Sequence, residues 1–448
     1  MNQTLYLVAG LGKTGHSIAG YLQRRNKPFV VFDTRREVEG LAEFTKEFPG
    51  VDVFLGELPA TIYEQLAGII ASPGIALDEP FMQEARRLNI PVFGDIECLA
   101  QEVKAPVIAI TGTNGKSTVT TLVGEMAKAA GIKVAVAGNI GLPVLDLLDN
   151  DENYELWVLE LSSFQLDLTS SLKPIAATIL NISPDHLDRH HSLAAYIEAK
   201  QGIYHNAQFL LYNRDDEQTY PTKNSTANQS VLINYGLDEP REKNWGIIEQ
   251  AGLSYLAQGN KPLLAIDKLR IKGKHNWQNA LAACALATAA GIQTECITKV
   301  LESFAGLPHR CQWVRTLEGV DWINDSKGTN IGATISAISG IGGSMQGKIV
   351  LIAGGLGKGA DFTELRLPVS DYVRAVVLIG KDAKEIEKAL SDLIPVHHAQ
   401  SLDSAVTLAK EQAMPGDVVL LSPACASLDM FRDFNHRGEA FASLVTKL

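Results

Sequence analysis

The strongest chemical signal in this sequence is a glycine-rich loop, TGTNGKST, at residues 111–118, which follows an apolar run ending at Ile110. Between a strand and a helix expected to begin at about Ser117, the backbone N–H groups of such a loop point at phosphates, and the helix N-terminus adds a favourable dipole. Lys116 can reach the β- and γ-phosphates of a nucleotide, and the hydroxyl of Ser117 or Thr118 can ligate Mg²⁺. Because Ile110 stands where the usual GxxxxGK[ST] pattern has Gly, an ordinary strand–helix turn is the alternative.

A second glycine-rich turn, GLGKTG at residues 10–15, has the layout of a dinucleotide-binding motif. It follows an apolar run and precedes a stretch with helical periodicity, and Asp33 ends the next apolar run. Such a motif supplies glycines for a tight turn and an acid for a ribose, so NAD or NADP is one candidate ligand. However, Arg35 adds a cation beside the acid, and a hydride-transfer enzyme needs no second phosphate loop. We favour another phosphate-bearing ligand. The turn at residues 72–75, SPGI, is a third loop of this site or a plain Pro-Gly turn.

Metal chemistry is indicated in the middle of the chain. Glu160 ends the run LWVLE, and a carboxylate at a strand tip commonly holds Mg²⁺, although a solvated loop acid is the alternative. The segment NISPDHLDRHH crowds two acids and three histidines. This crowding argues against a lone core histidine at His186, whereas we expect His190 and His191 at the surface. Zinc spacings such as HExxH are missing, so the sequence does not predict a zinc site. From its own helical segment alone, Lys200 is expected to be a solvated lysine.

Further polar loops follow in the last third of the chain. Asn276 and Asn279 are three residues apart near the start of an expected helix, where their amides can read a base edge or cap the helix. Arg310 follows in GLPHR, and the loops NDSKGTN, GGLGK and SPACASLD each come after an apolar run. Such side chains at strand ends indicate a site. Cys425 has no paired base, so we expect a buried thiol and not a nucleophile.

These loops need elements that bring them to common sheet edges. Short apolar runs alternate with helix-period segments over most of the 448 residues. This pattern predicts an α/β fold with mostly parallel sheets covered by helices. The polar, weakly patterned stretch 213–244 is expected to form loops and edge strands. Two seams divide the chain into three expected domains: 1–94, 95–305 and 306–448.

The bulk composition narrows the class of protein. A net charge of −11 and a pI near 5.5 argue against a nucleic-acid-binding protein, which usually carries a basic face. The five cysteines form no CxxC pair, which favours free thiols in a reducing compartment. We expect no signal peptide, because the first residues lack basic and apolar regions, and no membrane span, because the Ala-rich run 280–292 is too short. A cytoplasmic protein is predicted.

Taken together, these segments resemble the Mur ligases, ATP-dependent amide ligases of peptidoglycan synthesis. The motifs span essentially the whole chain in the family's order: GTNGKST, ELSSFQL, NISPDHLDRH, GKHNWQNALAA, GLPHR, NDSKGTN, GGLGKGADF and SPACASLDMF. Within the family, GLGKTG with DTR and SPACASLDMF resemble the members that add D-glutamate to UDP-N-acetylmuramoyl-L-alanine. The DNPR motif of many diaminopimelate-adding members is not present. The resemblance implies a monomer with Rossmann-like first and last domains and a central P-loop domain that binds ATP.

The resemblance also assigns ligands to individual residues. The first domain would hold the UDP-linked substrate and not NAD, and the residues implied for this substrate are Gly12, Lys13, Thr14, Asp33, Thr34, Arg35, Gly74, Asn139 and His186. The residues implied for ATP are Gly112, Thr113, Asn114, Gly115, Lys116, Ser117, Thr118, Asn276, Asn279, Arg310 and Asp325. Those implied for Mg²⁺ are Ser117, Glu160, His186 and Lys200. Lys200 falls where the family has a carbamylated lysine, a cation converted into a carboxylate-like ligand. The residues implied for D-glutamate are Lys327, Thr329, Lys358, Ser427 and Phe434. The catalytic set would be Lys116, Glu160, His186 and Lys200.

The implied reaction makes chemical sense. A carboxylate is a poor acyl donor, whereas the acyl phosphate formed with ATP carries a good leaving group, and Mg²⁺ and Lys116 would offset charge on the transferring phosphoryl group. The amine of D-glutamate then attacks, and phosphate leaves. The alternatives are another Mur ligase or a folylpolyglutamate-type ligase, an NAD-dependent dehydrogenase built on GLGKTG, and a P-loop NTPase switch that needs a protein partner.

Overall fold

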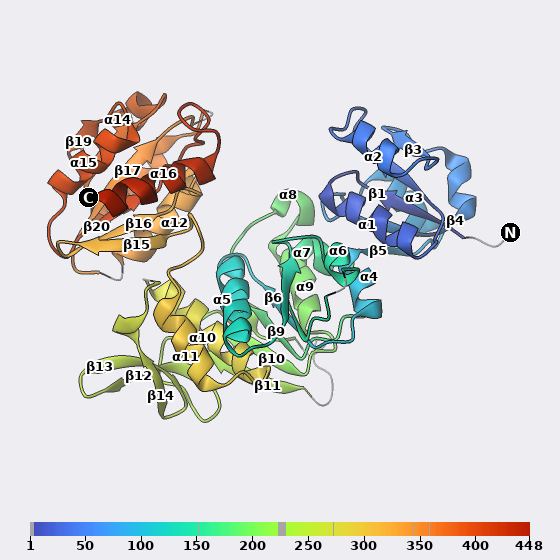
Figure 1. Cartoon of the computed structure of the whole chain (residues 1–448), viewed down its shortest axis with the longest axis horizontal. Helices are drawn as coiled ribbons and strands as arrows, with labels where there is room; N and C mark the ends of the chain where they lie inside the picture. The colour runs from blue at the N-terminus through green and yellow to red at the C-terminus, as the bar shows by residue number, and fades with distance from the viewer. Residues whose placement is uncertain (1–3, 151, 223–229, 272, 344, 358) are drawn as a thin grey trace. The chain divides into compact units, whose positions relative to one another are not determined.

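The computed structural model describes residues 4–150, 152–222, 230–271, 273–343, 345–357 and 359–448, whose strands form three sheets (Figure 1). Two compact units share the chain. The first consists of Met1–Gly246, Gln258–Lys261 and Leu281–Ile297, and the second of Ile247–Ala257, Pro262–Ala280 and Thr298–Leu448. The predicted α/β class with mostly parallel sheets is confirmed.

The N-terminal sheet belongs to the first unit and has the strand order β3-β2-β1-β4-β5, with all neighbouring strands parallel. Its strands are β1 (Leu5–Ala9), β2 (Phe29–Asp33), β3 (Val53–Leu55), β4 (Leu66–Ala71) and β5 (Val92–Gly94). The accompanying helices are α1 (Lys13–Arg24), α2 (Leu41–Glu47), the 3₁₀ helix η1 (Ala60–Gln65), α3 (Pro80–Arg87) and α4 (Asp95–Glu102). Strand β2 is buried along its whole length, as expected of a parallel strand covered on both faces. The loops after β1, β2 and β4 therefore meet at one edge.

The turn between β1 and α1 depends on its third glycine. A Cβ atom at Gly15 would lie 1.7 Å from the carbonyl oxygen of Gly10, so no larger residue fits there. The close approach lets α1 begin at Lys13, directly beside the turn. This is the packing role that the motif predicts for its last glycine.

The middle sheet has the order β14-β13-β12-β11-β10-β9-β6-β8-β7. Its strands are β6 (Val107–Thr111), β7 (Val134–Gly138), β8 (Leu156–Glu160), β9 (Ala176–Ile179), β10 (Phe209–Asn213), β11 (Val231–Tyr235), β12 (Trp245–Gln250), β13 (Leu253–Gln258) and β14 (Lys261–Ala265). The helices are α5 (Lys116–Ala129), α6 (Val144–Leu148), α7 (Ser163–Leu166), α8 (Leu187–His190), α9 (Leu193–Gln201), η2 (Gly202–Tyr204), η3 (Glu217–Thr219), η4 (Ile266–Lys268), α10 (Lys274–Ala289) and α11 (Thr294–Ser303). Helix α5 packs on β7 and β8.

One expectation for the middle of the chain is wrong. The stretch 213–244 was expected to contribute edge strands, but β11 pairs in parallel with both β10 and β12 and so lies inside the sheet. Its first two residues, Val231 and Leu232, are 40% and 45% exposed, so the strand lacks a continuous buried run. Backbone pairing on both sides holds it in place without one.

The C-terminal sheet belongs to the second unit and has the order β15-β16-β20-β17-β18-β19, parallel except for the β15–β16 pair. Its strands are β15 (Gln312–Leu317), β16 (Val320–Asn324), β17 (Ile349–Gly354), β18 (Val373–Ile379), β19 (Val396–His398) and β20 (Val418–Leu421). The helices are α12 (Ile331–Gly342), η5 (Phe362–Leu365), α13 (Arg366–Tyr372), α14 (Ala383–Leu390), α15 (Leu402–Gln412) and α16 (Phe434–Lys447). The ends of β16, β17 and β20 carry the loops singled out in the sequence.

Two further expectations concern cysteines and membrane spans. All five cysteines are free thiols, as predicted. None of the described helices is both long enough and apolar enough to cross a membrane.

Candidate active site

The phosphate loop has the strand–loop–helix setting that its sequence predicts. Strand β6 enters it, and α5 begins at Lys116 after Gly115, whose φ of 82° is in the left-handed region that favours glycine. The amide of Asn181 fixes the loop from a neighbouring segment, because its Oδ1 accepts from the N–H of Asn114 at 2.8 Å and its Nδ2 donates to the same residue's carbonyl at 3.1 Å. Lys116 Nζ donates to the carbonyls of Gly112 and Thr113, each at 2.9 Å. The ammonium group therefore lies over the loop.

Lys200 is buried beside this loop. Only 2% of the residue is exposed, and its Nζ donates to the Gly112 carbonyl at 3.0 Å and to Thr111 Oγ1 at 3.2 Å. Burial, with the charge of Lys116 as a second cause, lowers the pKa of Lys200 to about 7, against the opposing pull of Asp185 and Glu160. The interpretation of Lys200 as a solvated helix lysine is wrong, because α9 turns this side chain into the interior. The segment's own sequence is only weakly amphipathic and gives no sign of this orientation.

Glu160 combines burial with an unsatisfied oxygen. It lies at the end of β8 and is 2% exposed, and its Oε1 accepts from Asn139 Nδ2 at 2.8 Å. Within the described part of the chain, Oε2 has no hydrogen-bond partner. A buried carboxylate oxygen without a donor is suited to a hard cation, so the residue fits the predicted Mg²⁺ ligand. No group of three or more His, Cys, Asp or Glu side chains among the described residues could by itself hold a metal ion.

The three histidines of the NISPDHLDRHH segment lie in different surroundings. His186 caps α8 with a φ of 53°, its side chain is 49% exposed, and its ring lies 5.0 Å from that of Phe164. His191 is at the surface as expected, with 70% of its side chain exposed. The same expectation for His190 is wrong, because its side chain is only 7% exposed. It stacks on Phe164 at 5.3 Å, and its Nε2 lies 2.9 Å from Ser163 Oγ, so α7 covers it.

A cavity of about 550 Å³ opens at the carboxyl edge of the N-terminal sheet. Its lining includes every residue that the sequence associated with the UDP-linked substrate except His186: Gly12, Lys13, Thr14, Asp33, Thr34, Arg35, Gly74 and Asn139. The remaining lining residues are Gly10, Leu11, Ser72, Pro73, Ile75, Gly138 and Gln165. The turn 72–75 is therefore part of the site. Gln165, from the ELSSFQL motif, was not predicted as a site residue.

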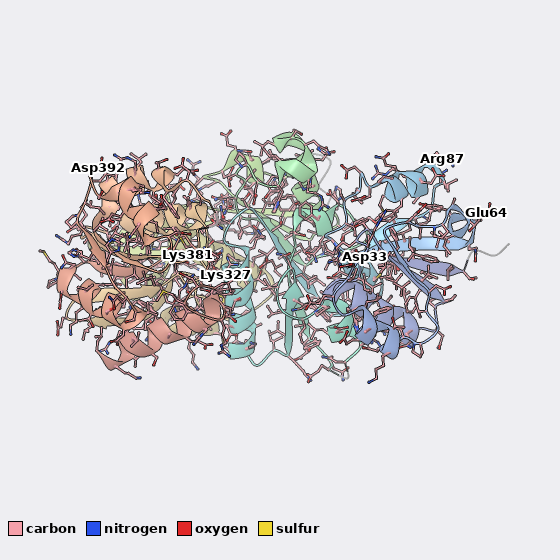
Figure 2. All side chains as sticks on the ribbon, turned by 90° about the horizontal axis from the view of Figure 1, so that it is seen from above. Asp33, Glu64, Arg87, Lys327, Lys381 and Asp392 are labelled. Carbon is pink, nitrogen blue, oxygen red and sulfur yellow. The ribbon has the colours of Figure 1, made fainter. Side chains whose placement is uncertain are left out.

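The acid of the glycine-rich turn is not free. Asp33, labelled in Figure 2, is 2% exposed and accepts from Arg35 Nε and Nη2, each at 2.8 Å, and from the Leu11 N–H at 2.8 Å. Burial acts to raise the pKa of Asp33, but hydrogen bonds from Arg35 and Leu11 outweigh it and lower the pKa to about 2. The Asp33 carboxylate thus holds the turn and Arg35 in place. Because it is already bonded in this way, it is poorly suited to be the ribose-binding acid of an NAD enzyme.

The second unit carries the remaining residues that the sequence associated with ATP. Asn276 and Asn279 are each 7% exposed and lie on one face of α10, with Asn279 Nδ2 donating to Asn276 Oδ1 at 3.1 Å. Arg310 is exposed in a turn whose flanking residues, His309 and Cys311, have φ of 61° and 41°. Asp325 Oδ1 accepts from the Cys311 N–H at 3.1 Å, so this buried carboxylate holds the turn that presents Arg310.

The residues implied for D-glutamate lie around the start of α16. Lys327 Nζ is 5.1 Å from the centre of the Phe434 ring, and Ser326 Oγ donates to the Phe434 carbonyl at 2.8 Å. Ser427 is 3% exposed and Thr329 is partly buried, whereas Lys358 lies outside the described residues. Cys425 is buried, as predicted, and burial raises its pKa to about 12.

Arg437 is a residue of this region that the sequence did not reveal. It is 1% exposed, and its guanidinium donates to Ser326 Oγ at 2.9 Å, to the Ser326 carbonyl at 2.8 Å and to the Cys425 carbonyl at 3.2 Å. It thereby joins α16 to the loops after β16 and β20. An arginine in the polar first turns of a terminal helix carries no sequence signal for such a role.

Comparisons with known proteins agree with this geometry. The chain matches the models of the MurD-like N-terminal domain at residues 4–94, the Mur ligase middle domain at 110–287 and the glutamate ligase domain at 309–425. It is 65% identical to the UDP-N-acetylmuramoylalanine–D-glutamate ligase of Legionella pneumophila over the full length of both chains, and 48% identical to that of Pseudomonas aeruginosa over 99% of this chain and 98% of the relative. The crystal structure of a UDP-N-acetylmuramate–alanine ligase from Thermotoga maritima shares the fold, with a TM-score of 0.54, 20% identity and 99% coverage of both chains. The chain therefore belongs to the Mur ligase family.

Proposed function

We propose that this chain is the ATP-dependent ligase that joins D-glutamate to the L-alanyl carboxylate of UDP-N-acetylmuramoyl-L-alanine, releasing ADP and phosphate. The observation that carries the proposal is the position of Asn139. Asn139 lines the 550 Å³ cavity. Its side-chain Nδ2 also donates to the carboxylate of Glu160, which lies beside the phosphate loop. A UDP-linked substrate in that cavity would extend its far end toward Asn139, where a carboxylate could meet a γ-phosphate.

Substrate binding would use loops at the edges of the N-terminal and middle sheets. Arg35 and Lys13 would offset the charge of the diphosphate, with Gly12, Thr14, Thr34 and Gly74 as close neighbours and Asp33 holding Arg35 in place. Asn139 and His186 would contact the muramoyl-alanine end. The loop 112–118 would bind the phosphates of ATP, with Asn276 and Asn279 at the adenine and Arg310 and Asp325 at the phosphate and ribose.

The buried, unpartnered Oε2 of Glu160 supports a site for a hard cation. Ser117, Glu160, His186 and a carbamylated Lys200 would hold Mg²⁺, which when bound neutralises charge on the phosphates. Carbamylation needs an uncharged amine close to neutral pH, and the lowered pKa of Lys200, about 7, meets that need. The modification also replaces a buried cation next to Lys116 with an anion, which removes the repulsion between the two amines.

The chemistry then proceeds in two steps. The L-alanyl carboxylate attacks the γ-phosphorus, ADP leaves, and an acyl phosphate forms while Lys116 stabilises the transferring charge. The neutral amine of D-glutamate attacks the acyl carbon, and phosphate leaves from the tetrahedral intermediate with the amide bond formed. Lys327, Thr329, Ser427 and Phe434 would bind D-glutamate, with the ammonium group of Lys327 suited to a carboxylate.

We also propose how the protein is organised and where it acts. The chain would act as a monomer in the cytoplasm, as an enzyme of peptidoglycan precursor synthesis. Its domains would be a UDP-substrate domain at 1–94, an ATPase domain at 95–305 and an amino-acid-binding domain at 306–448.

The test is product formation, measured by mass together with phosphate release, from ATP, UDP-N-acetylmuramoyl-L-alanine and a panel of amino acids. We expect product with D-glutamate alone among D-glutamate, L-glutamate, D-aspartate and meso-diaminopimelate. A preference for diaminopimelate would contradict the assignment of the amino acid, and tight NAD binding without UDP binding would contradict the ligase itself.

A further inference from the structure

Arg189 makes a contact that the proposed mechanism does not use. It lies on α8, and its Nη1 and Nη2 donate to the carbonyls of Gly74 and Ile75, each at 3.0 Å. Its guanidinium carbon also lies 4.5 Å from the centre of the Phe164 ring. The planar fork is therefore fixed on one side by two acceptors and over its face by an aromatic ring.

The two carbonyls belong to the turn between β4 and α3, which lines the nucleotide cavity. The turn is tied to its own sheet by the Ser72 N–H, which donates to the Ala9 carbonyl at 2.8 Å, and is closed by the Ile75 N–H, which donates to the Ser72 carbonyl at 3.0 Å. Beyond that closure, the two guanidinium bonds are what hold Gly74 and Ile75 to the segment that carries α8. A bidentate, charge-assisted donor sets both peptide planes at once, whereas a single donor would leave the turn able to pivot.

The other end of the same short helix carries His186. The Arg189 N–H donates to the His186 carbonyl at 3.0 Å, and both side chains contact Phe164. A movement of the turn 72–75 is thus transmitted through one helical turn to the histidine proposed to contact the muramoyl-alanine end and Mg²⁺. The contact would therefore link the turn of the UDP cavity to the histidine proposed for the other end of the substrate.

We propose that Arg189 is a positioning residue that fixes the turn 72–75 against α8, so that binding of the UDP-linked substrate and the placement of His186 are coupled. The inference deepens the proposed function and rests on it for the identity of the substrate. Arg189 itself would not touch the reacting atoms. Its effect would be seen in the KM for the UDP-linked substrate and in kcat, and not in the binding of ATP by its separately anchored loop.

The experiment compares the wild-type full chain with Arg189→Ala, Arg189→Lys and the control Arg87→Ala. Arg87 lies in the same unit, is labelled in Figure 2, and pairs with Glu84 one helical turn away on α3. For Arg189→Ala we expect the KM for UDP-N-acetylmuramoyl-L-alanine to rise at least about tenfold and kcat to fall, because two hydrogen bonds from a charged group are lost. The KM for ATP should stay within about twofold. Arg189→Lys keeps the cation over Phe164 but lacks the fork, so we expect partial rescue. Arg87→Ala should match the wild type.

A second arm measures UDP binding by calorimetry together with the melting temperature. Weaker UDP binding by Arg189→Ala at an unchanged melting temperature supports the inference. A KM for the UDP-linked substrate within about twofold of wild type would overturn it, and so would equal rises in the KM of all three substrates accompanied by a large loss of melting temperature. If the wild type forms no product, the proposed function fails, and the UDP-binding arm still decides the role of Arg189.

Discussion

Removal of carbon dioxide is expected to inactivate this enzyme reversibly through Lys200. The residue is 2% exposed and its pKa is about 7, compared with 10.5 for an ordinary lysine. At about pH 8, roughly nine-tenths of such amines are neutral, whereas roughly 0.3% are neutral at the ordinary pKa, which is a gain of about 300-fold in the form that reacts with CO₂. The neutral fraction of Lys200 grows as the pH rises through about 7, so the extent of its carbamylation should also increase.

The same lowering of the pKa has a consequence for stability. The folded protein holds the Lys200 proton less tightly than the unfolded chain, so the unfolded state binds more protons between about pH 7 and about pH 10.5. Burial of the cation therefore destabilises the unmodified fold by about 5 kcal/mol below that window, and the penalty is relieved as the pH rises through it. A carbamate removes the buried cation, so bicarbonate should raise the melting temperature most clearly near neutral pH.

The assay uses ¹³C-labelled bicarbonate and detects the carbamate carbon by NMR, alongside phosphate release in CO₂-free and bicarbonate-supplemented buffer. Lys128→Ala is the matched control, because Lys128 is an exposed helix lysine that pairs with Glu125. We expect the control to keep the carbamate signal and Lys200→Met to lose it. Full activity of the wild type in CO₂-free buffer, with no carbamate signal, would show that the active enzyme does not need a carbamate on Lys200.

Further predictions concern the phosphate loop, the glycine-rich turn after β1 and the residue that follows helix α1. Lys116→Ala should reduce phosphate release at least about 100-fold, because its amine lies over the loop, where it donates to the carbonyls of Gly112 and Thr113, and supplies charge to the transferring phosphoryl group; near-normal release would show that the loop is misassigned. Asp33→Ala should weaken UDP binding, measured by calorimetry, about tenfold or more, because Arg35 loses the carboxylate that orients it; unchanged binding would contradict that role. Arg25→Ala should lower the free energy of unfolding in urea by about 1–2 kcal/mol, because Arg25 donates to both Glu102 and Asp149 and each carboxylate loses that cation, leaving Asp149 paired with Arg24 and Glu102 bonded to the Tyr21 hydroxyl; a change in KM without loss of stability would contradict this role.

The strands and the loops that follow them were predictable because parallel strands buried on both faces are short continuous apolar runs. Leu5–Ala9 and Val418–Leu421 are strands over the predicted residues, and the glycines and charged residues after them fall at sheet edges. Side-chain burial was harder to predict from the sequence. Local sequence alone predicted a solvated Lys200 and a surface position for His190, yet Lys200 packs beside the phosphate loop and His190 packs against Phe164. Local periodicity records a residue's neighbours in sequence, and these two are buried by residues far from them in the chain.

Arg189 and Arg437 show why the supporting residues of the site are harder to read than its ligand-binding loops. A phosphate loop can be recognised in a sequence because glycine, lysine and serine must occur together within a few positions to form it. The two arginines act on backbone carbonyls, which every residue possesses, and their acceptors lie 115 positions away for Gly74 and 111 positions away for Ser326. Because a backbone carbonyl can belong to any residue type, the acceptors of these arginines cannot be recognised in the sequence. An arginine on a short or terminal helix looks like surface charge until the fold brings a loop to it, and its function is to hold that loop in one conformation. The residues that contact ligands are thus visible as motifs, whereas the residues that fix the motifs' geometry become visible only as contacts.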